Sequence, residues 1–92
     1  MRRKKPDPER AVALKYERGR DPAPRVTAKG SGAVAAKILE LARKHGVPIE
    51  KDPALLDALY RLDLNEEIPE ELYRVVAEIL AFVYRMNALK RA

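Results

Sequence analysis

The chain has 92 residues, of which 47% are apolar, 19 are basic and 14 are acidic, and it contains no cysteine. This length fits one small domain and excludes an enzyme built from separate substrate and cofactor modules. The lack of cysteine excludes a disulfide scaffold, a thiolate metal site and cysteine catalysis, and it is compatible with a reducing cytoplasm. No apolar run approaches the roughly 20 residues that span a bilayer, so no membrane span is expected.

Residues 1–9 have the composition of a flexible arm, with two prolines, six charged side chains and Met1 as the apolar residue. Four of those charges are basic and lie together at 2–5, so the basic excess is local. Such a cluster predicts weak, salt-sensitive attraction to nucleic acid or anionic lipid. Because no aromatic side chain lies nearby to stack on bases, no dedicated nucleic-acid interface is expected, and a solubilising or membrane-proximal tail is the simpler interpretation.

A first strand is predicted over 10–16. Its alternation places Val12, Leu14 and Tyr16 on one face and small alanines on the other, and the small face has the size to lie under a helix. A charged loop with glycine and two prolines follows over 17–24.

Two further strands are predicted. The second covers 25–28 and is expected to end at the Gly-Ser-Gly run of 30–32. The third is an edge strand at 47–49, because Pro48 has no N–H to donate to a ladder.

Two helices are predicted between these strands and residue 65. Val34, Ile38 and Leu41 recur at helical spacing and are expected on the buried side of the first helix, which Gly46 ends in the left-handed conformation. Asp52 followed by Pro53 is a capping residue with proline at the first helical position, so it predicts the start of the second helix.

A third and longest helix is predicted from Pro69 to about Asn87, and it carries two apolar rows. The row expected to face the core comprises Leu72, Val75, Val76, Ile79 and Val83. The second row comprises Tyr73, Ala77, Leu80 and Tyr84. Composition favours burial of the second row between the sheet and another element, and the alternative leaves it for a partner.

No catalytic, metal or cofactor site is expected. His45 lies at a predicted helix end beside basic residues, with no carboxylate at ligand spacing, so it is interpreted as charge that complements the helix terminus. The glycines at 30 and 32 lack the lysine of a phosphate loop, and no histidine neighbours Ser31 or Thr27 in the sequence, so no nucleophilic triad is expected. We therefore expect a protein that is not an enzyme.

A series of short motifs, in order, resembles the cytoplasmic C-terminal domain of the FlhB/YscU family, the export-switch component of bacterial flagella and injectisomes. The motifs are AVALKY (11–16), APRV (23–26), AKG (28–30), VPI (47–49), ALY (58–60), IPEELY (68–73), VAE (76–78) and LA (80–81). None of these motifs is specific by itself, and together they span residues 10–88 at family-like spacings.

The resemblance implies an α/β fold: a small mixed sheet of three short strands, with a frayed fourth as the alternative, surrounded by three or four helices. It divides the chain into the basic arm of 1–9 and one FlhB C-terminal-like domain over 10–89. It also implies a place in the cytoplasm, peripheral at the flagellar export apparatus, and a free-standing relative of the C-terminal portion, without the family's membrane domain.

Family members cleave themselves at an Asn-Pro-Thr-His turn, where the asparagine side chain attacks its own carbonyl carbon. The corresponding positions here are Pro6, Asp7, Pro8 and Glu9, and none of them matches. The reaction needs an amide nitrogen directly before proline, and both asparagines of the chain, Asn65 and Asn87, precede other residues. Self-cleavage is therefore not expected.

The resemblance also implies a hydrophobic patch that recognises export substrates, and its positions fall on Ala23, Pro24, Ala77 and Leu80. We call these four the predicted docking residues. The expected function is non-enzymatic binding of flagellar export substrates, export-gate proteins or other export-apparatus proteins. The alternative is weak binding of nucleic acid or lipid through the arm.

Overall fold

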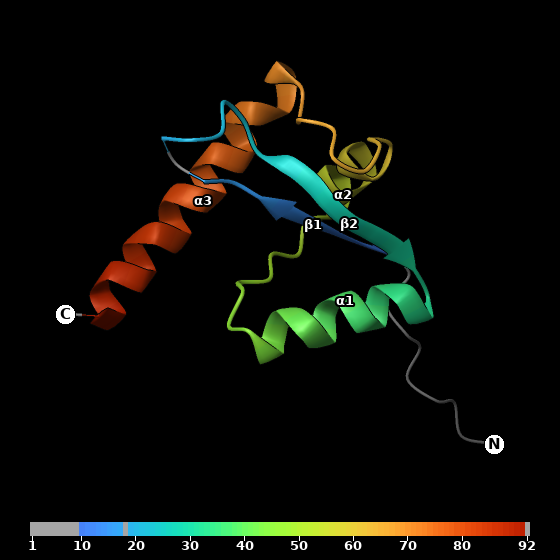
Figure 1. The fold of residues 1–92 in the computed structure, drawn as a ribbon, viewed down its shortest axis with the longest axis horizontal. Helices are drawn as coiled ribbons and strands as arrows, with labels where there is room; N and C mark the ends of the chain where they lie inside the picture. Colours follow the sequence, from blue (N-terminus) through green and yellow to red (C-terminus); the bar gives the residue numbers. More distant parts are fainter. Residues whose placement is uncertain (1–9, 18, 92) are drawn as a thin grey trace.

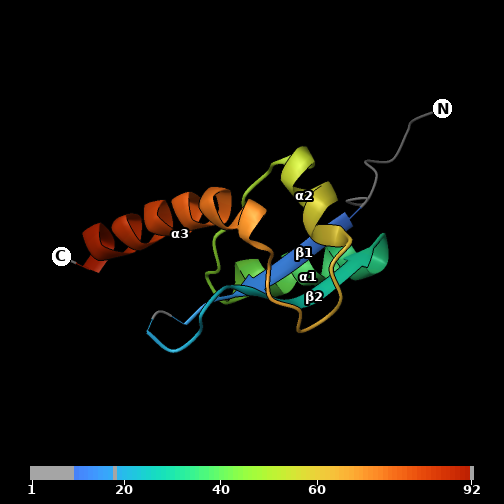
Figure 2. The ribbon, with the colours of Figure 1, turned by 90° about the horizontal axis from the view of Figure 1, so that it is seen from above.

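The computed structural model describes residues 10–17 and 19–91, and the side chains of 10–17 and 19–80. The predicted arm and the former cleavage-turn positions Pro6, Asp7, Pro8 and Glu9 lie outside the described residues. In chain order the elements are β1 (Arg10–Lys15), β2 (Arg25–Ser31), α1 (Ala33–Lys44), α2 (Pro53–Tyr60) and α3 (Glu70–Arg91). Helix α1 covers one face of the sheet and α2 the other, while α3 runs obliquely away at the loop end of the strands (Figures 1 and 2). The α/β class and the single domain are confirmed.

β1 and β2 form an antiparallel pair in which Ala11 lies opposite Gly30. One extra residue on β2, Thr27, makes a bulge after the Ala13–Ala28 pair, and its hydroxyl donates a hydrogen bond to the Ala13 carbonyl (3.3 Å). β2 extends to Ser31, three residues further than predicted. Glycine is tolerated within a strand where another part of the chain approaches the backbone closely, so Gly30 does not end β2.

The described residues form a sheet of two strands, so the predicted third strand at 47–49 was wrong. The N–H groups of Gly46 and Val47 donate to the Arg43 and Ala42 carbonyls (3.3 and 2.8 Å), which closes α1 in a Schellman motif with Gly46 at φ 69°. Pro48 has no N–H, and the Val47 N–H is already bonded, so residues 47–49 have few donors left to pair with a neighbouring strand.

Another segment pairs with β2 instead. Residues 65–68 form one antiparallel bridge, Arg25 to Glu67, beside hydrogen bonds from Val26 N–H to the Glu66 carbonyl (3.0 Å) and from Ile68 N–H to the Pro24 carbonyl (2.9 Å). The beginning of β2 therefore has partners on both sides.

The core lies between the sheet, α2 and the first half of α3. Leu59, Ile68 and Val76 form its buried centre. The half-buried side chains around them are Val12, Leu14, Leu55, Leu62, Leu72 and Leu80. The predicted apolar face of the first strand is confirmed by the place of Val12 and Leu14 in this core.

The buried side of α1 differs from the prediction. Ala35 is fully buried, whereas Val34 is 55% exposed and Leu41 is 42% exposed. α1 contacts both strands, whose facing side includes buried Ala11 and, opposite it, Gly30. Such small residues let α1 approach the sheet closely, so the small Ala35 takes the buried position, while Ile38 and Leu39 are half-buried.

Both predicted helix starts are supported by local chemistry. The Asp52 carboxylate accepts a hydrogen bond from Leu55 N–H (3.1 Å), with Pro53 at the first position of α2. α3 begins with Glu70 and Glu71, whose charge favours a helix N-terminus. Within the described part of the chain, no helix is long and apolar enough to cross a bilayer.

Candidate docking surface

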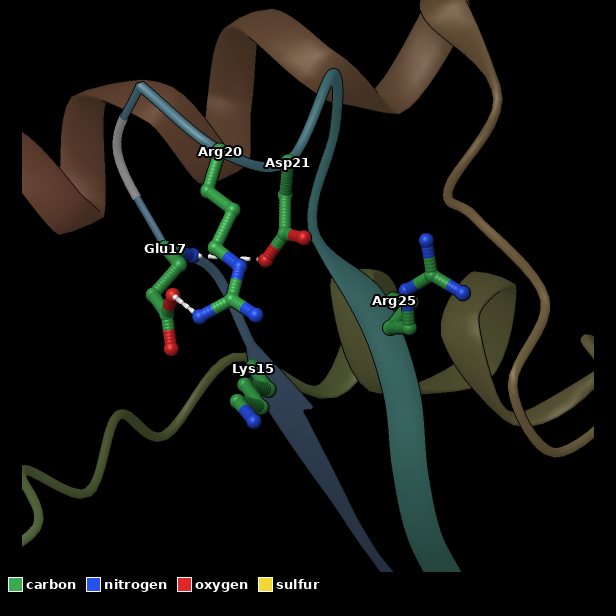
Figure 3. Close-up of a pocket in the computed structure, with 5 residues that line it drawn as sticks. All are labelled: Lys15, Glu17, Arg20, Asp21 and Arg25. Carbon is green, nitrogen blue, oxygen red and sulfur yellow. Dashed lines mark hydrogen bonds and ion pairs between the residues drawn. The ribbon is translucent and has the colours of Figure 1, made fainter.

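The β1–β2 loop is held in shape by its own polar groups. The Glu17 carbonyl accepts hydrogen bonds from the N–H groups of Arg20 (3.0 Å) and Asp21 (2.8 Å), while the Asp21 carboxylate accepts from Glu17 N–H (2.8 Å). The Arg20 guanidinium pairs with the Glu17 carboxylate (2.9 Å), and Gly19 takes a positive φ of 83° that favours glycine. Figure 3 shows the two of these bonds that involve side chains, from Glu17 N–H to Asp21 and from Arg20 to Glu17. The loop therefore presents the next residues, 22–24, in a fixed conformation.

Two predicted docking residues end this loop, and they differ in accessibility. Ala23 is half-buried, whereas Pro24 is fully buried and its carbonyl is bonded to Ile68 N–H. Ile68 belongs to the core centre with Val76 of α3. Pro24 thus connects the loop to the core. Because the Pro24 ring is buried, a partner would contact the residues next to Pro24 rather than the ring itself.

The other two predicted docking residues lie on α3. Leu80 is half-buried and packs against the core centre, while Ala77 is half-buried and lines a shallow hollow on the side of the helix. The residues around this α3 hollow are Glu70, Tyr73, Arg74, Ala77 and Glu78. Tyr73 and Ala77 belong to the predicted second apolar row, so this row is neither fully enclosed nor fully free in the described residues.

The loop and α3 lie side by side. Both ribbon views place the β1–β2 loop alongside the first half of α3 (Figures 1 and 2). The Pro24–Ile68 hydrogen bond and the shared core of Ile68, Val76 and Leu80 hold them there. The structure therefore brings the two halves of the predicted docking residues to the same end of the molecule. Leu80 packs against the core, in line with the interpretation that the second row is buried, whereas Tyr73 and Ala77 line the α3 hollow.

A second, charged hollow at the same end was missed by sequence reasoning. Lys15, Glu17, Arg20, Asp21 and Arg25 line it, which makes it polar rather than apolar (Figure 3). The Arg25 guanidinium pairs with the Glu67 carboxylate (3.3 Å), so the rim also ties β2 to the 65–68 segment. The charged residues over 15–25 are evident in the sequence. That they line one hollow depends on the conformation of the β1–β2 turn, which the sequence pattern does not show.

The described residues contain no group of three or more His, Cys, Asp or Glu side chains that could hold a metal ion. His45 is exposed at the end of α1, where its own N–H donates to the Leu41 carbonyl (3.0 Å). This position agrees with its interpretation as part of the helix terminus.

Comparison with known proteins decides the family. The model of the FlhB HrpN YscU SpaS family matches residues 8–83. The chain belongs to this family. The resemblance proposed from the motifs is confirmed, and the VPI motif belongs to the match although it forms no strand here.

Relatives of two different lengths are similar to the chain. The uncharacterized protein YlqH of Bacillus subtilis (strain 168) is 46% identical over 78 residues, which cover 85% of this chain and 84% of that protein. The flagellar biosynthetic protein FlhB of Yersinia enterocolitica is 46% identical over 82 residues, which cover 88% of this chain but 21% of that protein. The chain thus spans about a fifth of the flagellar relative.

The FlhB fold is shown by a solved structure as well. The crystal structure of the cytoplasmic domain of FlhB from Shewanella putrefaciens superimposes with a TM-score of 0.81 at 40% sequence identity. The superposition covers 89% of this chain and 68% of that one. The arrangement of strands and helices is therefore that of an FlhB cytoplasmic domain.

Proposed function

We propose that the chain is a non-enzymatic component of bacterial type III protein export that binds flagellar export substrates or export-apparatus proteins. Family membership supports the link to export, because similar relatives are named flagellar biosynthetic proteins. One structural observation carries the binding role: half-buried Tyr73 and Ala77 line a shallow hollow on α3.

The shape of α3 suits recognition by apolar contact. Val76 is buried in the core and holds the helix against the body, which leaves the adjoining side with Tyr73 and Ala77 facing the α3 hollow. The small Ala77 side chain makes room beside the tyrosine ring, and Glu70, Arg74 and Glu78 form a polar rim. An apolar centre within a polar rim is the usual anatomy of a protein interface.

We also propose that the chain neither catalyses a reaction nor cleaves itself. Succinimide formation at an Asn-Pro bond needs the asparagine amide nitrogen, and the chain has no asparagine before a proline. Asp7-Pro8 is the nearest pair in type, but a carboxylate lacks that nitrogen. We therefore expect this chain to bind partners without cleaving itself.

The binding role is tested by isothermal titration calorimetry with a purified flagellar export substrate. Ala77→Glu puts a long charged side chain into the α3 hollow and is expected to weaken binding about ten-fold or more. Val75→Glu is the matched control, because Val75 is 41% exposed on the same helix and lies about 200° around it from Ala77. We expect it to bind like the unmodified chain. Equal loss in both variants, with both still folded by circular dichroism, would contradict the proposal.

Deletion of residues 2–5 separates this role from binding through the arm. The deletion removes four basic side chains and leaves α3 and the β1–β2 loop in place. If docking is apolar and local to α3, affinity for the export substrate stays within about two-fold of the unmodified chain. Abolished binding would show that the arm, and not the docking surface, holds the partner.

A further inference from the structure

Exposed aliphatic side chains gather on α1 and the residues that follow it. Six large hydrophobic residues are exposed in the described part of the chain, and four of them, Val34, Leu41, Val47 and Ile49, lie within 34–49. Scattered exposed hydrophobic residues need no explanation, but a continuous patch marks an interaction site. The question is therefore whether these four side chains share one surface.

Helical geometry places Val34 and Leu41 in one row together with half-buried Ile38, whereas Ile49 lies beyond the helix. Val34, Ile38 and Leu41 follow one another at spacings of four and three residues, so they lie on one side of α1. Val47 is the second residue beyond the helix cap in the Schellman motif, where an apolar side chain commonly packs beside the last turn. We call Val34, Ile38, Leu41 and Val47 the α1 row. Val47 is 51% exposed at its end.

The α1 row is not a second layer of the existing core. The sheet side of α1 is occupied by fully buried Ala35, which lies about 100° around the helix from Val34. The core of Leu59, Ile68 and Val76 lies on the other face of the sheet, with α2 and α3 (Figures 1 and 2). The row therefore faces away from the core of Leu59, Ile68 and Val76, although Val34 also lies close to Gly30 of β2 and Ile38 is half-buried.

Charge indicates what kind of partner covers the row. Residues 10–49 carry nine basic and three acidic side chains, whereas residues 50–78 carry three basic and nine acidic ones. On α1 itself Lys37 pairs with Glu40 (3.0 Å), and Arg43 and Lys44 form no ion pair among the described residues. The row is apolar, and the helix that carries it is basic.

We propose that the α1 row binds an amphipathic helix of a partner protein that presents aliphatic side chains at spacings of three and four residues and acidic side chains at their edge. This is the common mode in which a helix lays its apolar side on a hydrophobic strip. The acidic edge of the partner lies against Lys37 and Lys44, which flank the row on one side of α1, and this steers association and fixes the orientation. The site is distinct from the predicted docking residues, which lie on the other side of the sheet.

Two other occupants fit the row less well. A second copy pairing α1 with α1 would bring Lys37 and Lys44 of each helix together, with a single carboxylate on each helix to offset them. A lipid surface favours a wide apolar side with aromatic anchors, whereas the α1 row has no aromatic member and extends about 10 Å along the helix from Val34 to Leu41.

The test is an NMR titration of the ¹⁵N-labelled chain with two synthetic amphipathic helical peptides. Both carry leucine at i, i+4 and i+7, one with glutamate at the flanking positions and the other with lysine. We expect the acidic peptide to shift the amide signals of 34–47 and to bind more weakly as salt is raised. The basic peptide is expected to bind at least about five-fold more weakly.

Matched variants locate the site. Leu41→Gln removes an exposed apolar side chain without adding charge, and it is expected to weaken the acidic peptide about five-fold. Leu64→Gln is the control, because Leu64 is 56% exposed and lies in the acidic half of the chain. Reversing charge with Lys44→Glu is expected to weaken the acidic peptide and to strengthen the basic one.

Several results would overturn the proposal. Equal affinity for both peptides, shifts confined to α3 and the β1–β2 loop, or equal loss in Leu41→Gln and Leu64→Gln would each do so. Self-association that depends on Leu41 in light scattering would assign the row to a second copy. Binding to phosphatidylglycerol vesicles that depends on Leu41, without peptide binding, would assign it to a membrane.

Discussion

At the scale of single residues, Lys29 connects parts of the chain that are far apart in sequence. Its ammonium group on β2 donates to the carbonyls of Tyr60 (3.0 Å) and Leu62 (2.7 Å), at and just beyond the end of α2. The same group lies over the Tyr60 ring, 5.3 Å from its centre. The last turn of α2 has no basic residue of its own, so a side chain of the sheet satisfies its carbonyl groups.

Lys29→Met tests this role. Loss of the two charge-assisted hydrogen bonds and of the contact with Tyr60 is expected to lower the free energy of unfolding by about 1–2 kcal/mol, measured by urea denaturation. Lys37→Met, which breaks an exposed pair on α1 with Glu40, is the control and is expected to cost about 0.5 kcal/mol or less. Similar small losses in both variants would mean that Lys29 does not hold the end of α2.

At the scale of elements, local chemistry was predictable from the sequence and packing was not. The cap at Asp52 and the left-handed Gly46 follow from residue types that act within one turn, and both are confirmed. The buried side of α1 was predicted from residue spacing alone. Spacing shows that a helix has an apolar side, but it does not show which side chains fit against the neighbouring elements. Here the sheet offers Ala11 and Gly30, and that choice buries Ala35.

The contact between β2 and α1 can be measured through Gly30. A β-carbon on Gly30 would lie 2.7 Å from Val34 Cβ, closer than side chains tolerate, so Gly30→Ala is expected to cost about 1–3 kcal/mol of unfolding free energy. The same β-carbon would meet Val34 Cγ1, so adding Val34→Ala removes that contact, leaves the one with Val34 Cβ, and is expected to restore about 1 kcal/mol. Strict additivity of the two changes in urea denaturation would show that the helix does not approach the strand at this point.

At the scale of the whole molecule, the sequence predicted the family, the α/β class and the end of the molecule where docking is proposed. It placed Ala23, Pro24, Ala77 and Leu80 in one patch through the resemblance, and the structure brings the loop and α3 together. It did not predict that Pro24 is fully buried or that residues 65–68 pair with β2. Both depend on contacts between segments some forty residues apart, which no local pattern records.

For the chain as a whole, we propose that this FlhB-family domain binds partners without cleaving its own backbone. Intact-mass spectrometry of the purified 92-residue chain, incubated for several days at neutral pH and 37 °C, tests this claim most directly. The expected result is one mass, that of the uncut chain, because no asparagine precedes a proline. A pair of fragments whose masses correspond to cleavage between Asp7 and Pro8, accumulating with time, would contradict it.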